Sequence, residues 1–170
     1  MKPILFNTKM VRAILDGRKT TTRRVIKPQP IEQPKRDIKN RKPLAFWTTC
    51  DDILQKWIKP PYQPGDVLYV RETWAQHEGA VGGIIFKARC PEKLAAVKKW
   101  KPSIFMPKEA ARIFLSVTDV KAERLQDIYL ADCLKEGVQL STAEESDLVI
   151  QGIRARERFS SVWDSTVKKA

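Results

Sequence analysis

The chain of 170 residues contains one histidine, His77, and this scarcity excludes several kinds of active site. A zinc site built from histidines needs several of them, and a Ser-His-Asp relay could use only His77, so we expect neither. The three cysteines, Cys50, Cys90 and Cys133, stand far apart without a close pair. We therefore expect buried reduced thiols, no metal and no cofactor, with a nucleophilic cysteine beside His77 as an open alternative.

A phosphate-binding glycine loop and a long apolar run are also missing. Gly79, Gly82 and Gly83 lack the preceding strand and following helix that a phosphate loop needs, so we interpret them as turn residues. No run is apolar enough to cross a bilayer, and no pattern is typical of a secretory leader or of a strongly amphipathic basic helix. We predict a cytoplasmic protein without a membrane partner, and attraction to a membrane surface stays an alternative.

Acidic residues are too few to balance the basic ones. The chain has 20 Asp and Glu against 32 Lys and Arg, which leaves a formal net charge of +12. Such an excess attracts polyanions, so nucleic acid is the partner class that we expect from the charge. The hydrophobic share of 42% suffices for one packed core, so we predict a single domain over 1–170, with an exposed, basic, proline-rich insertion at about 27–43.

Local patterns predict several short strands and a few helices. Strands are indicated where β-branched and aromatic residues gather, over 4–6, 20–26, 44–48, 67–74, 84–88 and 111–120. Helices are indicated from a Thr8 cap through Leu15 to a stop at Gly17, then over 51–58, 91–100, 125–136 and 142–163. These elements do not alternate as β-α-β units, which favours an α+β fold with a small barrel or mixed sheet.

The segment 17–24 reads Gly-Arg-Lys-Thr-Thr-Thr-Arg-Arg and holds four basic residues, three threonines and no acid. Arginine forks and threonine hydroxyls suit phosphate oxygens, so we predict anion or nucleic-acid contacts at Arg18, Arg23 and Arg24. A solvated edge strand is the alternative interpretation of the same charges. Gly17 is predicted to make the turn between a helix and a strand.

The strand predicted over 67–74, with 84–88 as its hairpin partner, carries further candidates. Alternate residues share a face, which places Glu72 and Trp74 on one side and Arg71 on the other. An inward Glu72 would be an alternative acid or base, and a cross-strand salt bridge is the other interpretation. We also predict nucleic-acid or anion contacts for Arg71, Glu72, Trp74 and Trp100.

Trp100 is the tryptophan best placed to contact a nucleic acid. Lys98, Lys99 and Lys101 surround it in the sequence. Nucleic-acid bases stack well on tryptophan rings, and neighbouring lysines add attraction for phosphate. Most of the five tryptophans are expected to belong to the core.

The segment 17–24 resembles the signature of the ASCH domains of the PUA-like superfamily, which is Gly-x-Lys-x-x-Glu-x-Arg after a short helix. Gly17, Lys19 and Arg24 match this signature. Thr22 stands at the acidic position, as in a small branch of the family that hydrolyses the amide of acylated cytidines. The resemblance extends through 64–74, 111–120 and 125–137, and it is strongest to phage and prophage ASCH-like proteins.

The resemblance implies a small PUA-like mixed β-barrel with peripheral helices, and RNA or a modified nucleoside as ligand. In the hydrolytic branch a lysine acts as base, a threonine as nucleophile, and a glutamate late in the next helix completes the set. These roles fall on Lys19, Thr22 and Glu136. We expect an amidohydrolase or a ribonuclease with Lys19 as its central residue. A noncatalytic RNA-binding module and a phage interaction protein stay as alternatives.

Catalysis by this set has two physical requirements. Lysine can act as a base only if its pKa falls, and repulsion from Arg18, Arg23 and Arg24, helped by burial, would lower the pKa of Lys19. Residues three apart on a continuous strand point to opposite faces, so Lys19 must lie in the turn, outside the strand, if it is to meet Thr22.

Overall fold

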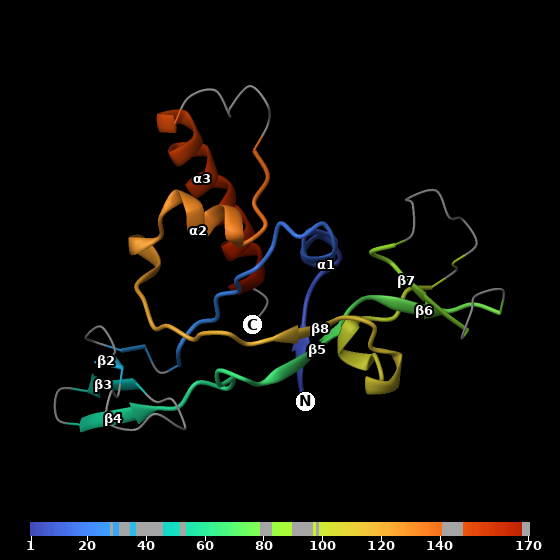
Figure 1. Ribbon diagram of the computed structural model, residues 1–170, viewed down its shortest axis with the longest axis horizontal. Coiled ribbons are helices and arrows are strands. Elements are labelled where there is room, and N and C mark those ends of the chain that lie inside the picture. The colour runs from blue at the N-terminus through green and yellow to red at the C-terminus, as the bar shows by residue number, and fades with distance from the viewer. Residues whose placement is uncertain are drawn as a thin grey trace. The chain divides into compact units, whose positions relative to one another are not determined.

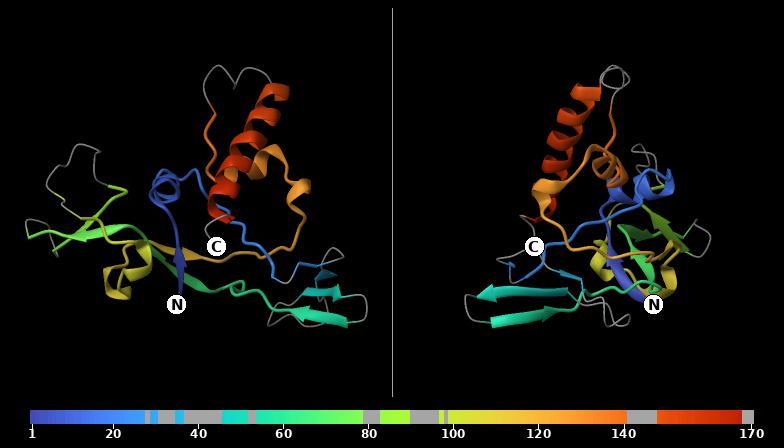
Figure 2. Two further views of the ribbon diagram at one scale, coloured as in Figure 1. Left: turned by 180° about the vertical axis from the view of Figure 1, so that it is seen from behind. Right: turned by 60° about the vertical axis from the view of Figure 1, so that its left-hand side comes forward.

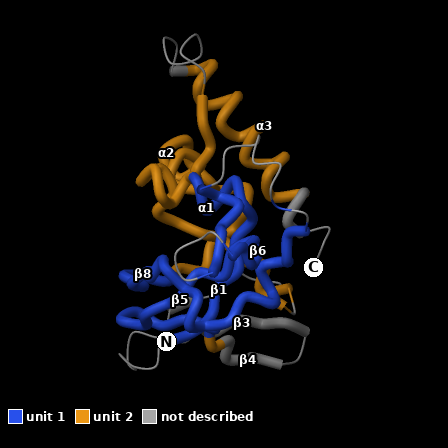
Figure 3. Tube along the Cα trace, turned by 90° about the vertical axis from the view of Figure 1, so that its right-hand side faces the viewer, with its two compact units in different colours: residues 1–12, 60–120 blue, residues 13–59, 121–170 orange. Residues whose placement is uncertain are grey.

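The computed structural model describes residues 1–27, 29–30, 35–36, 46–51, 54–78, 83–89, 97, 99–140 and 148–167. These residues form a mixed α+β protein of small sheets and three helices, in which no described sheet closes into a barrel (Figure 1). The chain groups into two compact units, which are residues 1–12 with 60–120 and residues 13–59 with 121–170 (Figure 3). The prediction of one domain stays a prediction.

The first unit is built on a three-stranded sheet in the order β1-β5-β8 (Figure 1, Figure 2). Strand β5 (Val67–Arg71) runs parallel to β1 (Lys2–Leu5) and antiparallel to β8 (Phe114–Ser116). Alternate residues of a strand face opposite sides, and here Leu68 and Val70 are buried on one of them. The face that the sequence assigns to Leu68, Val70, Glu72 and Trp74 is therefore the inward one.

The strand predicted over 67–74 is divided in two. After β5 the chain forms a separate strand, β6 (Trp74–Gln76), which pairs antiparallel with β7 (Ile84–Phe86). The predicted hairpin partner is thus confirmed, although it pairs with the second piece. The strand predicted over 111–120 is shorter than expected, because β8 holds three residues.

In the second unit, β2 (Lys35–Arg36), β3 (Phe46–Asp51) and β4 (Leu54–Ile58) form an antiparallel sheet. The helix predicted over 51–58 is wrong. In a segment this short, the spacing of apolar residues does not distinguish a helix from a strand. Residues 54–58 pair with β3, where Trp47 lies opposite Trp57, and so form a strand. Most of the predicted insertion at about 27–43 lies outside the described residues.

Helix α1 (Thr8–Leu15) begins one residue earlier than a Thr8 cap requires. Asn7 takes that role, because its Oδ1 accepts a hydrogen bond from Met10 N at 2.9 Å. The helix ends as predicted at Gly17, whose φ is +73°. The strand predicted over 20–26 does not form, since the described backbone there is extended but has no partner ladder.

The helix predicted over 125–136 is also divided, into a 3₁₀ turn at Leu125–Asp127 and helix α2 (Leu130–Lys135). Helix α3 (Leu148–Val167) follows, and the predicted residues 142–147 before it lie outside the described ones. The two helices share a core of buried residues, which are Ile128, Cys133, Val138, Ala155 and Phe159.

Cys133 is a fully buried free thiol, as expected, and burial raises the pKa of its thiol. The side chains of Cys50 and Cys90 lie outside the described ones. Within the described residues no helix is long and apolar enough to cross a membrane.

Gly137, directly after Glu136, is the position where added volume should be most harmful. Its φ is +87°, and a Cβ there would lie 2.9 Å from the Cβ of Ala13 and 3.1 Å from the Cβ of Lys19. Gly17 in the same unit has a φ of +73° but no atom within 4 Å of such a Cβ. Gly17→Ala therefore measures only the cost of placing a residue with a Cβ at a positive φ.

We expect Gly17→Ala to lower the free energy of unfolding by about 1–2 kcal/mol. Gly137→Ala should lower the free energy of unfolding by at least about 1 kcal/mol more than Gly17→Ala, because overpacking adds to the backbone strain. Urea unfolding of the two variants checks this, and equal losses would contradict the close approach at Gly137.

Candidate functional site

Two segments far apart in the sequence lie side by side within the second unit. Lys19 and Glu136 form an isolated antiparallel β-bridge, and the N–H groups of Thr20 and Thr21 donate to Lys135 O at 2.8 and 3.1 Å. The missing side chain of Gly137 leaves room for Lys19 at this contact. The backbone thus fixes the basic motif against the end of α2.

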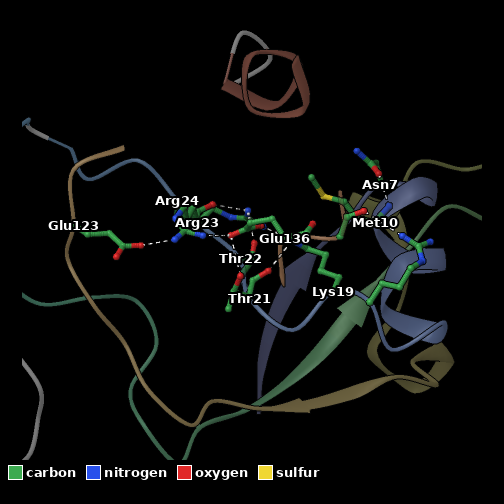
Figure 4. A network of polar contacts seen from close by, with 11 residues as sticks. Asn7, Met10, Lys19, Thr21, Thr22, Arg23, Arg24, Glu123 and Glu136 are labelled. Atoms are coloured by element: carbon green, nitrogen blue, oxygen red, sulfur yellow. Dashed lines mark hydrogen bonds and ion pairs between the residues drawn. The ribbon is translucent and has the colours of Figure 1, made fainter. Parts of the chain in front are cut away.

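The side chains of Lys19 and Glu136 meet in the interior (Figure 4). Lys19 Nζ lies 2.6 Å from Glu136 Oε2, and the two side chains are 2% and 7% exposed. The ammonium also donates to Glu136 O at 3.1 Å and to Thr21 O at 2.7 Å. Three acceptors match its three hydrogens, so the structure brings together the base and the glutamate of the predicted set.

The predicted lowering of the Lys19 pKa is confirmed, with a different main cause. Burial lowers the pKa of Lys19 below its ordinary value of 10.5, and repulsion from Arg24 and Arg23 lowers it further. The charge and hydrogen bond of Glu136 oppose this shift in the pKa. Arg18 instead lies 2.7 Å from an Asp16 oxygen and donates to Gly137 O at 3.2 Å.

Arg23 connects the second oxygen of Glu136 to further acids. Its Nη1 donates to Glu136 Oε1 at 3.0 Å, and its Nη2 lies 2.6 Å from Glu123 Oε1 and 3.9 Å from Asp132 Oδ2. The guanidinium also lies 5.9 Å from the centre of the Phe159 ring. Arg23, predicted to bind an anion, therefore already lies against carboxylates of its own chain.

Along residues 19–24, alternate side chains point to opposite sides of the chain. Lys19, Thr21 and Arg23 all contact Glu136, with Thr21 Oγ1 3.4 Å from Glu136 Oε1. The residues between and after them are exposed. This inner row is the arrangement of a strand, since residues two apart share a side, although no ladder forms.

Thr22 belongs to the exposed side of this segment. Its Oγ1 accepts a hydrogen bond from Arg24 Nη1 at 3.1 Å, and both side chains are exposed. The hydroxyl that reaches Glu136 is that of Thr21, which the sequence reasoning missed. The signal was present, because Thr21 is two positions after Lys19 and so shares its side of an extended chain, whereas Thr22 is three positions after it.

Glu72 lies in the first unit and is 1% exposed. Both of its oxygens accept hydrogen bonds from Arg112, at 2.8 and 2.9 Å, and its N–H donates to Met106 Sδ at 3.2 Å. Of the two interpretations of Glu72, the salt bridge is the one that forms. Arg112 precedes β8, so the pair is not part of the strand ladder.

Arg71 binds backbone instead of presenting an open cation. Its guanidinium donates to Met106 O at 2.9 Å and to Ile104 O. Two hydrogen bonds to adjacent carbonyl groups fix the turn at Ser103–Phe105 against β5.

The two tryptophans predicted to contact nucleic acid also lie in the first unit. Trp74 is 6% exposed, and Lys101 Nζ lies 4.7 Å from the centre of its ring. Trp100 is half-buried, with Lys87 Nζ 5.9 Å from its ring centre. The helix predicted over 91–100 falls mainly outside the described residues. Both rings thus have a lysine of the chain over them.

No family model, curated protein or solved structure matches this chain. The resemblance to ASCH domains therefore stays a prediction that rests on the motif. Among the described residues no group of histidines, cysteines and acids could hold a metal ion. The site is an ion-pair network of lysine, glutamate and arginine beside a threonine hydroxyl.

We expect Lys19→Met to lower the free energy of unfolding by about 3–5 kcal/mol, because it leaves the buried carboxylate of Glu136 without its closest partner. Lys135→Met is the matched control, since that side chain is 55% exposed and pairs weakly with Asp132 at 3.5 Å. The control should change stability by less than about 0.5 kcal/mol. Urea unfolding measures both, and a loss at Lys19 as small as the control's would contradict the buried pair.

Proposed function

We propose that the chain is an ASCH-like protein of the PUA-like superfamily. It binds RNA or a modified nucleoside and hydrolyses the amide of an acylated cytidine, or RNA itself, at Lys19. The observation that carries the proposal is the contact of Lys19 with Glu136. The resemblance assigns both residues to one site, and they lie 2.6 Å apart although 117 positions separate them. A PUA-like barrel is part of the same proposal.

The chemistry of this site suits attack on a carbonyl. A hydroxyl oxygen forms a bond to the acyl carbon and gives its proton to a base, the C–N bond breaks, and the amine leaves with a proton. Water then hydrolyses the acyl ester and frees the hydroxyl. The lowered pKa of Lys19 favours its neutral, basic form, and Glu136 is close enough to exchange a proton with it.

Two hydroxyls are candidates for the attacking group. The resemblance assigns this role to Thr22, which is exposed beside Arg24. The contact with Glu136 favours Thr21, whose Oγ1 lies 3.4 Å from the carboxylate. Hydrogen bonds of catalytic groups are often long without substrate and shorten in the complex.

A noncatalytic RNA-binding module is the second candidate. It is favoured by the three acceptors around the Lys19 ammonium, because a fully hydrogen-bonded cation is stable without giving up a proton. The formal net charge of +12 supports either candidate.

We expect the protein to release cytidine from an N4-acylated cytidine, or to cleave single-stranded RNA, with a rate that rises with pH. A base works only when neutral, and the lowered pKa of Lys19 places this rise below pH 10.5. Lys19→Arg keeps the charge but cannot act as a base, so turnover should fall by about 10²–10⁴-fold. Chromatography of the products measures it.

Lys135→Arg is the control for these assays, because it changes an exposed lysine beside the same segment. Unchanged turnover in Lys19→Arg would remove Lys19 from the active site. Binding of RNA by the wild type without turnover of either substrate would favour the noncatalytic module.

Single substitutions of the threonines identify the hydroxyl. We expect Thr21→Ala to reduce turnover at least about 100-fold, with Thr21→Ser retaining most of it, because the Thr21 hydroxyl lies at Glu136. Thr22→Ala should have a smaller effect, and Thr20→Ala, also exposed, is the control. A larger loss of turnover in Thr22→Ala than in Thr21→Ala would identify Thr22 as the nucleophile.

A further inference from the structure

The three-stranded sheet of the first unit has an outer face that carries apolar and aromatic residues. On β5, Leu68 and Val70 are buried, so Val67 and Tyr69 point to the opposite side. Val67 is 39% exposed although it is a large apolar residue in a sheet. The outer face is therefore a surface in contact with solvent.

The register brings residues of all three strands together on this face. Tyr69 lies opposite Phe114 on β8 and opposite Pro3 on β1. Directly opposite residues project to the same side, with Cβ atoms about 4.5–5.5 Å apart in antiparallel pairs. Tyr69 and Phe114 are thus cross-strand neighbours, and Phe114 is 52% exposed.

A third exposed aromatic ring belongs to the turn that Arg71 binds. Arg71, on the outer side of β5, donates to the carbonyls of Ile104 and Met106 and so fixes the turn at Ser103–Phe105 beside the sheet (Figure 1). Met106 is fully buried, which holds the turn from the other side. Phe105 is nevertheless 68% exposed. We call Tyr69, Phe114 and Phe105 the aromatic face.

Exposed aromatic rings held by a rigid backbone indicate a binding surface. Monomeric proteins rarely expose contiguous apolar patches unless these have a partner. The hydrogen bonds of Arg71 and the strand ladder hold the backbone beneath these rings before any partner arrives. Binding to such a surface costs little ordering entropy.

We propose that the aromatic face binds single-stranded nucleic acid by stacking its bases on these rings. The net positive charge of the first unit favours a nucleic acid as the partner, because this unit has twelve Lys and Arg against six Asp and Glu. Lys108, exposed three residues after Phe105, can reach the phosphates. Bases stack on exposed aromatic residues of sheets, and a basic surface attracts their backbone. This site is separate from Lys19 and does not depend on the proposed hydrolysis.

Fluorescence anisotropy of labelled oligouridine RNA, and of the DNA of the same sequence, tests the proposal. Phe114→Ala and Phe105→Ala should each weaken binding at least about fivefold, which is the lower limit for loss of one stacked base. Tyr129→Ala is the control, since this tyrosine is 71% exposed in the other unit and should leave affinity unchanged. Because the substituted side chains are exposed, the variants should fold, and circular dichroism verifies it.

Phe114→Leu separates stacking from simple apolar contact. It keeps an apolar side chain but removes the ring, so it should weaken RNA binding about as much as Phe114→Ala. Duplex RNA of the same length, whose bases are already stacked, should bind all variants equally. Unchanged affinity of Phe114→Ala and Phe105→Ala for both oligonucleotides would overturn the proposal. A wild-type dimer that dissociates in Phe114→Ala, with RNA affinity unchanged, would overturn it in favour of a second copy of the chain.

Discussion

The contact of Lys19 with Glu136 is the constraint on which the rest of the candidate site depends. Removing two charges from water is costly, and the cost is offset only where hydrogen bonds satisfy both groups. Here the ammonium has three acceptors, and the carboxylate receives Lys19, Arg23 and Thr21. Gly137 suits the same contact, because a Cβ there would lie 2.9 Å from Ala13 Cβ and press on Lys19 Cβ at 3.1 Å. One ion pair therefore fixes the motif, the end of α2 and the position of the hydroxyl.

Much of this site could be predicted from the sequence, and the remainder depends on distant residues. Gly17 at a turn follows from local composition, and the resemblance placed Glu136 with Lys19. The lowered pKa of Lys19 was expected from the neighbouring arginines, whereas its main cause is burial, which depends on the fold. The acids around Arg23 were not foreseen, because Glu123 and Asp132 lie 100 or more positions away in the sequence. The motif itself contains no acid, but acids from other parts of the chain neutralise its charges in the fold.

The errors in the fold have a common physical origin. Residues 20–26 have strand composition, yet a strand needs a partner ladder, and here side chains to Glu136 hold the segment instead. The segment 54–58 shows the reverse error. A helix was predicted there from the spacing of few residues, but the segment pairs with β3 and forms a strand. The face of β5 was predictable, since a two-residue period leaves no such ambiguity.

Neutralisation within the motif determines where a polyanion can bind. Lys19 and Arg23 lie against carboxylates, and Arg18 pairs with Asp16, so most of the motif's charge is already balanced. The excess of +12 must therefore act elsewhere on the chain. A balanced, buried site suits proton transfer on a small part of a ligand, whereas a longer nucleic acid needs exposed cations and rings. The first unit has both, in its excess of basic residues and in the aromatic face. The proposed chemistry at Lys19 and the proposed binding of a single-stranded nucleic acid thus use different surfaces of the chain.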